Sequence, residues 1–227
     1  MKRLLLFDID GTLVWGGPAK AAFEDAMNKV FGTAGPIGSH DFSGKTDPQI
    51  ARELLTLAGF ESAGIEAGFD ALWQEYLSGL GARLVDKPMS VLPGVEELLD
   101  TLAHRDDVGL GLLTGNIAEG ARLKLDSVGL TEYFQVGGYG SDAEDRDRLP
   151  SVAMGRANEH FGTEFSPGSV GVVGDTPRDV ACGKNGGTKT VAVATGWYDA
   201  DTLASHEPDS VLEDLGDLGA SLRALMT

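Results

Sequence analysis

The sequence predicts an α/β fold, a doubly wound parallel sheet with an α-helical domain inserted close to its start. An apolar run at residues 4–7, flanked by charge, is typical of a buried parallel strand. From residue 91 onward, strand patterns alternate with helical patterns, which indicates repeated βα units with right-handed crossovers. Between these parts, residues 16–88 show helical spacing and no strand pattern. We therefore expect a core domain of residues 1–15 and 89–227 and a helical domain of residues 16–88.

The first predicted strand, residues 2–7, ends in two acids two residues apart, Asp8 and Asp10, followed by Gly11, which permits a turn. Ligands of open α/β sheets lie beyond the carboxyl ends of the strands, so both acids are expected to project into a pocket. Two close carboxylates repel each other, and Mg²⁺ relieves this because it takes oxygen ligands and keeps positions open for substrate phosphate. The alternative is an ordinary Asp-rich turn after a strand.

The inserted segment begins at a glycine-rich stretch, residues 14–18, that suits a hinge. Trp15 in this stretch either lines the pocket or packs the helical domain against the core. Apolar residues at helical spacing predict three helices, at residues 19–31, 48–58 and 66–80.

The second part of the chain carries the remaining units of the predicted sheet. Strands are expected at residues 108–113, 134–137, 169–173 and 189–194, and helices at residues 93–103, from 117 to about 128, 150–161 and 215–226. The first of these strands ends at Thr114, Gly115 and Asn116. The Thr114 hydroxyl and the N–H groups near it can hold phosphoryl oxygens. Alternatively, Thr114 and Asn116 only cap the following helix.

Composition restricts the function classes. The 227 residues contain 35 acids and 18 bases, for a formal charge of −17, which argues against nucleic acid and anionic membrane surfaces as partners. The single cysteine, Cys182, rules out an intramolecular disulfide and is expected to be buried packing in a reducing cytoplasm. No apolar run approaches the ~20 residues of a membrane span. We expect a cytoplasmic protein, a monomer or a homodimer.

The order of the polar signals resembles a known family. An acid pair, a hydroxyl, a basic residue and a second acid pair follow one another at strand ends, as in the four signature motifs of the haloacid dehalogenase (HAD) superfamily, which has a Rossmann-like core. The helical segment after the first motif resembles the cap domain of phosphoglycolate phosphatase-like members. Within it, the loop Ser43-Gly44-Lys45-Thr46-Asp47 resembles a cap loop that enters the site, where Lys45 would meet an anionic leaving group or remain a solvated loop residue.

The resemblance implies a role for each matching acid. Asp8 is the nucleophile, whose attack on phosphorus forms an acyl phosphate and divides one hard displacement into two easier steps. Asp10 protonates the leaving alcohol and then activates the attacking water, and its backbone carbonyl binds the metal. Asp8, Asp10 and Asp175 thus hold Mg²⁺. Asp179 reaches the metal through water or holds the basic residue, unless it only caps a helix with Thr176.

Two residues compete for the role of the basic residue, which neutralises the nucleophile and the phosphate. Arg146 and Arg148 both precede the helix of residues 150–161. A gap-free count from Gly162 favours Arg148, whereas a small loop difference favours Arg146. The Lys-Pro-x-Pro form common in the family is absent, so no well-known subgroup is assigned.

These features predict a Mg²⁺-dependent phosphatase that hydrolyses a small phosphorylated metabolite through an aspartyl-phosphate, with Thr114, Gly115 and Asn116 on the phosphoryl group. The alternative within the family is a phosphosugar mutase. A dehalogenase is disfavoured because that branch lacks the second acid of the first motif. A phospho-accepting signalling module is disfavoured because the acid pair follows the first strand and a helical insertion covers it.

Overall fold

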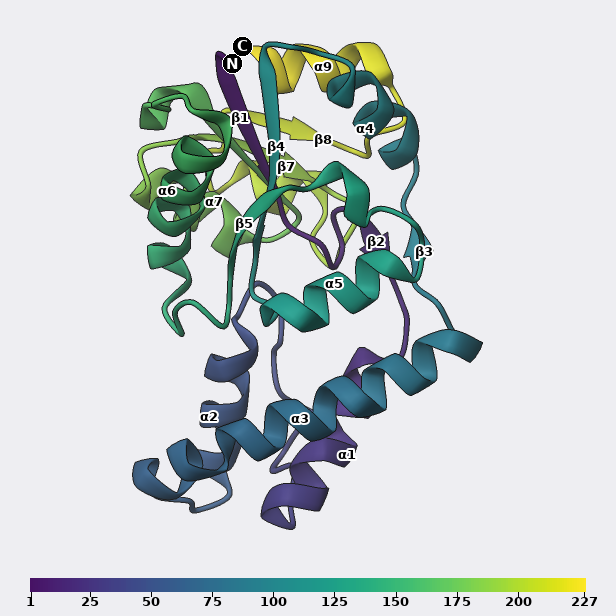
Figure 1. Ribbon diagram of the computed structural model, residues 1–227, viewed down its shortest axis with the longest axis vertical. Helices are drawn as coiled ribbons and strands as arrows, with labels where there is room; N and C mark the ends of the chain where they lie inside the picture. Colours follow the sequence, from purple (N-terminus) through teal and green to yellow (C-terminus); the bar gives the residue numbers. More distant parts are fainter.

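A computed structural model describes all 227 residues and contains a six-stranded parallel sheet in the order β5-β4-β1-β6-β7-β8 (Figure 1). The strands are β1 (Arg3–Phe7), β4 (Val108–Thr114), β5 (Val136–Tyr139), β6 (Val170–Gly174), β7 (Lys189–Val193) and β8 (Ser210–Leu212). The first strand lies in the middle, with Leu5 opposite Leu110 of β4 and Gly171 of β6. The predicted doubly wound α/β fold is confirmed.

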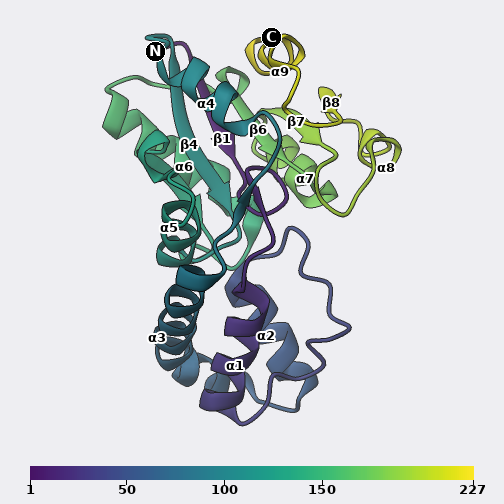
Figure 2. The same ribbon diagram turned by 90° about the vertical axis from the view of Figure 1, so that its right-hand side faces the viewer.

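Helices cover both faces of this sheet (Figures 1 and 2). They are α4 (Val95–Ala103), α5 (Ala118–Asp126), α6 (Leu149–Phe161), α7 (Pro177–Asn185), α8 (Ala200–Ala204) and α9 (Leu218–Met226). Because side chains alternate along a strand, β1 serves both layers. Leu5 and Phe7 belong to the apolar cluster that includes residues of α4, α5 and α9, whereas Leu4 and Leu6 pack with residues of α6 and with Cys182 of α7.

Three further helices lie beyond the carboxyl ends of the strands, clear of the sheet (Figures 1 and 2). They are α1 (Ala19–Phe31), α2 (Asp47–Leu57) and α3 (Ser62–Asp86), and α1 packs along α3. A short antiparallel ribbon joins β2 (Val14–Trp15) to β3 (Ser90–Val91), so the chain leaves and re-enters the sheet layer at one place. We call α1–α3 with their loops the cap; its treatment as a separate domain with the limits 16–88 remains a prediction.

The long helix α3 exceeds its predicted range of residues 66–80 at both ends. Glycines at several positions weaken its helical pattern, because glycine costs about 1 kcal/mol relative to alanine within a helix. At Gly68 the glycine has a structural reason: a Cβ there would lie 2.3 Å from the ring of Phe31 at the end of α1. Close packing against α1 therefore compensates for the low helix propensity. None of the helices combines the length and apolar composition needed to cross a bilayer.

Two elements near the C-terminus were not predicted, and one begins later than expected. Strand β8 has three residues, all only partly buried at the sheet edge, and α8 has five residues, so neither produces a clear hydrophobic period. Helix α9 begins at Leu218 rather than at 215, because the Asp217 side chain accepts a hydrogen bond from the N–H of Ala220 and caps the helix there.

Candidate active site

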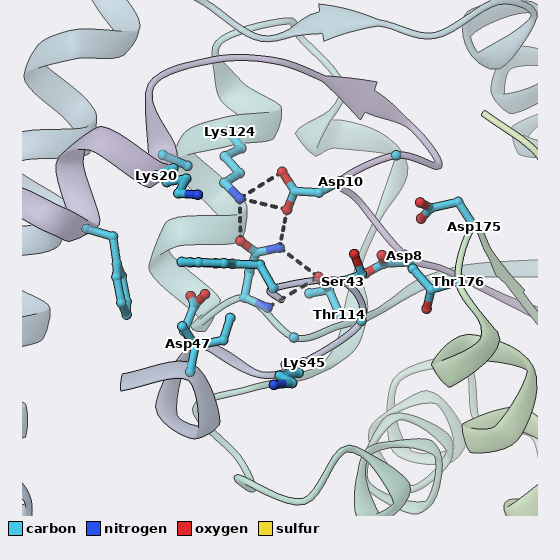
Figure 3. Close-up of a pocket in the computed structure, with 18 of the residues that line it drawn as sticks. Asp8, Asp10, Lys20, Ser43, Lys45, Asp47, Thr114, Lys124, Asp175 and Thr176 are labelled. Carbon is cyan, nitrogen blue, oxygen red and sulfur yellow. Dashed lines mark hydrogen bonds and ion pairs between the residues drawn. The ribbon is translucent and has the colours of Figure 1, made fainter. Parts of the chain in front are cut away.

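Three neighbouring strands bring the polar residues of the predicted site together. Asp8 follows β1, Thr114 ends β4 and Asp175 follows β6, and these are the three central strands of the sheet. All three residues line a cavity of about 650 Å³ whose walls come from both the sheet edge and the cap (Figure 3). The carboxyl ends of adjacent parallel strands form one edge, which explains why segments far apart in the sequence meet here.

Three buried carboxylates cluster at one end of this cavity, and two of them, Asp8 and Asp175, line it. Asp8, Asp175 and Asp179 are each at most 6% exposed and offer oxygens within 4.8 Å of one another. Burial raises the pKa of Asp8 to about 7, against the opposing effect of Arg146. Burial, followed by the charges of Asp179 and Asp8, holds the pKa of Asp175 well above its usual range.

An added cation would lower the free-energy cost of ionising these buried acids, because it favours the ionised form of each carboxylate. The donors are all carboxylate oxygens, which suits a hard divalent ion such as Mg²⁺. The cluster therefore fits a divalent metal.

Asp175 is positioned by the loop after β1 and by a glycine from a distant loop. The hydroxyl of Thr12 donates a hydrogen bond to Asp175 Oδ1 at 3.1 Å. A Cβ at Gly11, where φ is +87°, would lie 2.2 Å from Asp175 Oδ2, and a Cβ at Gly196 would lie 1.8 Å from the same atom. Only glycine fits at either position with Asp175 in place. The contact of Gly196 was not foreseen, since no local motif marks it.

The two carboxylate oxygens of Asp179 have different partners: one caps a helix and the other pairs with an arginine. Oδ2 accepts hydrogen bonds from the N–H and the hydroxyl of Thr176, at 3.0 and 2.6 Å, and so completes a capping box at the start of α7. Oδ1 pairs with the guanidinium of Arg146. Two of the three roles considered from the sequence, a capping role and a hold on the basic residue, thus coexist in one side chain.

Of the two candidate arginines, only Arg146 faces the cavity. Its Nη2 atom lies 3.3 Å from Asp8 Oδ1, and its Nη1 donates to the carbonyl of Gly44 in the cap at 3.1 Å. Its buried Nε–H has no hydrogen-bond partner, so one donor remains free. Arg148 is exposed. Both lie in one 3₁₀ turn, in which residues two apart point in different directions.

Asp10 stands apart from the carboxylate cluster and belongs to a second network. Its oxygens accept hydrogen bonds from Lys124 Nζ at 2.9 and 2.7 Å, and Asn116 Nδ2 also donates to Oδ2 at 2.8 Å. In Figure 3 its carboxylate points towards Lys124 and away from Asp175. Asn116 Nδ2 lies 2.8 Å from the Thr114 hydroxyl as well. Thr114 and Asn116 therefore lie in the site. The alternative that they only cap the following helix is wrong, because the N-cap of α5 is Ile117 and no side chain of the cap residue bonds the helix start.

Lys124 was missed by the sequence analysis. It lies on α5 and is 4% exposed, on the same face as the buried Ala121 and Leu125. A charged residue on the apolar face of a predicted helix was the available signal, because a buried lysine needs a partner.

The cap contributes residues 41–47, which we call the cap loop. The N–H of Asp47 donates to the carbonyl of Gly115 at 2.8 Å, and the Thr46 hydroxyl donates to the carbonyl of Glu144 at 2.7 Å. A Cβ at Gly115 would lie 2.0 Å from the Lys45 carbonyl oxygen, so this glycine allows the close approach. The cap loop is thereby bonded to the strand ends.

Two lysines of the cap line the cavity, and they differ in whether a carboxylate balances their charge. Lys45 Nζ pairs with Glu53 at 2.5 Å within the cap, so its charge is already balanced there. Lys20 on α1 also lines the cavity, over the ring of Phe42, and has no carboxylate within 4.0 Å. Trp15 lines the cavity too and packs on Trp197 of the core, with ring centroids 5.2 Å apart.

The comparisons with known proteins cover most of the chain. A family model described as haloacid dehalogenase-like hydrolase matches residues 5–193. The chain is 29% identical over 228 residues to a phosphoglycolate phosphatase of Synechococcus elongatus, covering 99% of each, and 30% identical over 233 residues to one of Rhodospirillum rubrum, covering 96% of this chain and 90% of that one.

Solved structures agree in fold. A hydrolase from Pseudomonas syringae has a TM-score of 0.73 at 20% identity, covering 98% of both chains. A putative beta-phosphoglucomutase from Bacteroides vulgatus has a TM-score of 0.67 at 19% identity, covering 99% of this chain and 88% of that one.

The cap loop supplies a stability test. Asp47 accepts the N–H of Ile117 at 2.9 Å, and burial raises its pKa to about 6. Because the folded protein holds this proton more tightly than the unfolded chain, the contribution of Asp47 to the free energy of unfolding is fully present below about pH 4. It is lost as the pH rises through about 6, the pKa in the folded protein. Asp47→Asn keeps an acceptor and does not titrate. Because part of Asp47 stays accessible from the cavity, we expect the variant to gain about 1–2 kcal/mol of unfolding free energy over wild type at neutral pH.

Urea unfolding of both proteins at about pH 4.5 and about pH 7.5 measures this difference. The gain of the variant should be larger at the higher pH. A difference that does not change with pH would contradict the assignment of the raised pKa to Asp47.

Proposed function

Because the chain belongs to the haloacid dehalogenase-like hydrolases, we propose that it is a Mg²⁺-dependent phosphatase acting on a small phosphorylated metabolite through an aspartyl-phosphate on Asp8. The observation that carries the proposal is the position of Asp8, which lies between two buried carboxylates and the guanidinium of Arg146 at one end of the cavity. Paired with that cation, Asp8 can be ionised in a buried place and can approach the phosphorus of a bound ester.

Two steps account for the reaction. A carboxylate oxygen of Asp8 attacks phosphorus, the bond from phosphorus to the leaving oxygen breaks, and Asp10 gives that oxygen a proton. Water then attacks the acyl phosphate, loses a proton to Asp10, and releases phosphate and Asp8. Mg²⁺, held by Asp8, Asp175 and the Asp10 carbonyl, would offset the charge of the phosphoryl group. Asp179 would act on this ion through water.

Donors for the phosphoryl oxygens lie beside Asp8, at the end of the neighbouring strand. The Thr114 hydroxyl and the backbone N–H groups of Gly115 and Asn116 follow β4 at the same sheet edge as Asp8. Arg146, whose guanidinium lies 3.3 Å from Asp8 Oδ1, is the charged donor to the same group. Such fixed donors stabilise charge that develops during transfer more than they stabilise the ground state.

For the substrate, the curated relatives indicate phosphoglycolate as the first compound to test. Its carboxylate would need a cation outside the carboxylate cluster. Lys20 has no carboxylate partner and suits this role, while Lys45 would first have to leave Glu53. The local cations also explain how a chain with a charge of −17 can bind an anion.

A phosphosugar mutase remains the alternative. The cavity of about 650 Å³ is large enough for a hexose phosphate. A mutase returns phosphate to a sugar hydroxyl, whereas a phosphatase releases it, so phosphate release from phosphoglycolate and from hexose phosphates separates the two functions.

The nucleophile is tested by Asp8→Asn, which keeps the shape of the side chain and removes its charge. We expect a loss of at least about 10³-fold in kcat on p-nitrophenyl phosphate, since removal of a nucleophile has effects of this size. EDTA should abolish wild-type turnover and added Mg²⁺ should restore it. Asp106→Asn, an exposed change in the turn before β4, is the control. Turnover of the Asp8 variant near the wild-type rate would refute the role.

The two arginines are separated by matched substitutions. Arg146→Gln should lower kcat/KM by about 10²-fold or more, because it removes a fixed charged donor from the phosphoryl site. Arg148→Gln should stay within about twofold of wild type. Removing Arg146 also leaves buried carboxylates unpaired, so thermal unfolding must show that the variant is folded at the assay temperature. Equal and mild losses in both variants would mean that neither arginine holds the phosphate.

A further inference from the structure

Lys124 is a buried cation at the site for which the proposed reaction steps have no use. It projects from α5 and is 4% exposed. Its Nζ makes three short contacts, to Asp10 Oδ1 at 2.9 Å, to Asp10 Oδ2 at 2.7 Å and to Asn116 Oδ1 at 2.6 Å. An ammonium group has three donors. All three are thus committed to protein acceptors, which leaves none for a substrate.

The partners of Lys124 connect the two sides of the proposed reaction. Asn116 donates from Nδ2 to Asp10 Oδ2 and to the Thr114 hydroxyl, both at 2.8 Å. A continuous chain of polar contacts therefore runs from the proposed proton donor, Asp10, to the proposed phosphoryl-binding hydroxyl of Thr114. Figure 3 shows this chain along one wall of the cavity, opposite Asp175.

Without Lys124, little would fix the carboxylate of Asp10. Its side chain is 44% exposed, and its remaining side-chain contact is the one from Asn116. A half-exposed carboxylate with a single hydrogen-bond donor has several orientations open to it. A proton donor must instead reach the leaving oxygen at hydrogen-bond distance.

We propose that Lys124 is a positioning residue, which holds the Asp10 carboxylate at the leaving-group side and the Asn116 amide beside Thr114. This proposal rests on the proposed function, in which Asp10 is the proton donor. Lys124 acts through Asp10 and Asn116 and does not contact the substrate. Its loss should therefore be most damaging where the leaving group needs a proton.

The test compares two leaving groups in Lys124→Met, a change of similar length that removes the charge. A simple alkyl phosphate needs protonation of its leaving oxygen, whereas p-nitrophenolate leaves well without it. We expect kcat/KM, which covers the steps up to formation of the aspartyl-phosphate, to fall by about 10²-fold for the alkyl ester and by less than about tenfold for p-nitrophenyl phosphate, in line with the usual size of general acid catalysis. Asp10→Asn should show the same split.

The combination of both changes should lower kcat/KM for the alkyl ester by less than about twofold beyond Asp10→Asn, because Lys124 would then have lost the group it positions. Arg122→Met is the control, since it removes a cation and two ion pairs from the exposed face of the same helix. It should leave kcat/KM for both esters within about twofold. Lys124→Gln, which keeps a donor, should fall between wild type and Lys124→Met and provides a second variant if the first one is not folded.

Three results would overturn the proposal. Equal losses on both esters would indicate a structural role, and multiplied losses in the combined variant would mean that Lys124 acts independently of Asp10. A rise in KM with unchanged kcat would make Lys124 a substrate-binding residue. If wild type hydrolyses neither ester in the presence of Mg²⁺, the proposed function fails and this inference fails with it, whereas unchanged leaving-group preference in an active Lys124→Met would overturn this inference alone.

Discussion

The structure depends most on the ion pairs of Arg146. Three buried carboxylates converge at the strand ends, and each raises the cost of ionising the others. Arg146 lies between Asp8 and Asp179 and supplies the protein's own counter-charge. Removing one member of such a buried group costs about 3–5 kcal/mol, because the remaining charges stay without partners. The same guanidinium donates to the carbonyl of Gly44 and thus links the cap to the carboxylate cluster.

The two acids of the first motif have separate environments although they are two residues apart. Asp8 is 6% exposed and pairs with an arginine from the turn before α6, whereas Asp10 is partly exposed and pairs with a lysine from α5. A nucleophile and a proton donor need different surroundings, and two cations from different elements provide them. This separation allows neighbouring carboxylates to take different roles in the proposed reaction.

The cap and the sheet edge are joined by contacts of two kinds. One apolar cluster runs from Leu72 and Tyr76 of α3 to Ile117 at the start of α5. Polar contacts of the cap loop add directional bonds to Gly115 and Glu144 on the core side. The strand ends therefore meet the cap at short range, and the cavity walls combine acids and a hydroxyl from the sheet with cations and aromatic rings from the cap.

Local patterns in the sequence were sufficient for the fold class, for the central strands and for the acids and hydroxyl at their ends. The reason is that a buried parallel strand appears as a run of consecutive apolar residues, and its carboxyl end as the polar residue that follows, as at Leu4–Asp8. The same holds for α1, whose range of residues 19–31 agrees with the structure. Short edge elements such as β8 bury too little apolar surface to leave such a pattern.

Tertiary structure alone decided which residues surround those acids. The choice between Arg146 and Arg148 depends on the direction of a single turn, and the contact of Lys124 with Asp10 joins residues 114 positions apart. The approach of Gly196 to Asp175 likewise depends on the placement of a distant loop. Pairings of this kind arise from how the elements pack. The sequence by itself therefore determined the strand ends with their acids and hydroxyl, and the packed fold selected the cations that lie beside the buried acids.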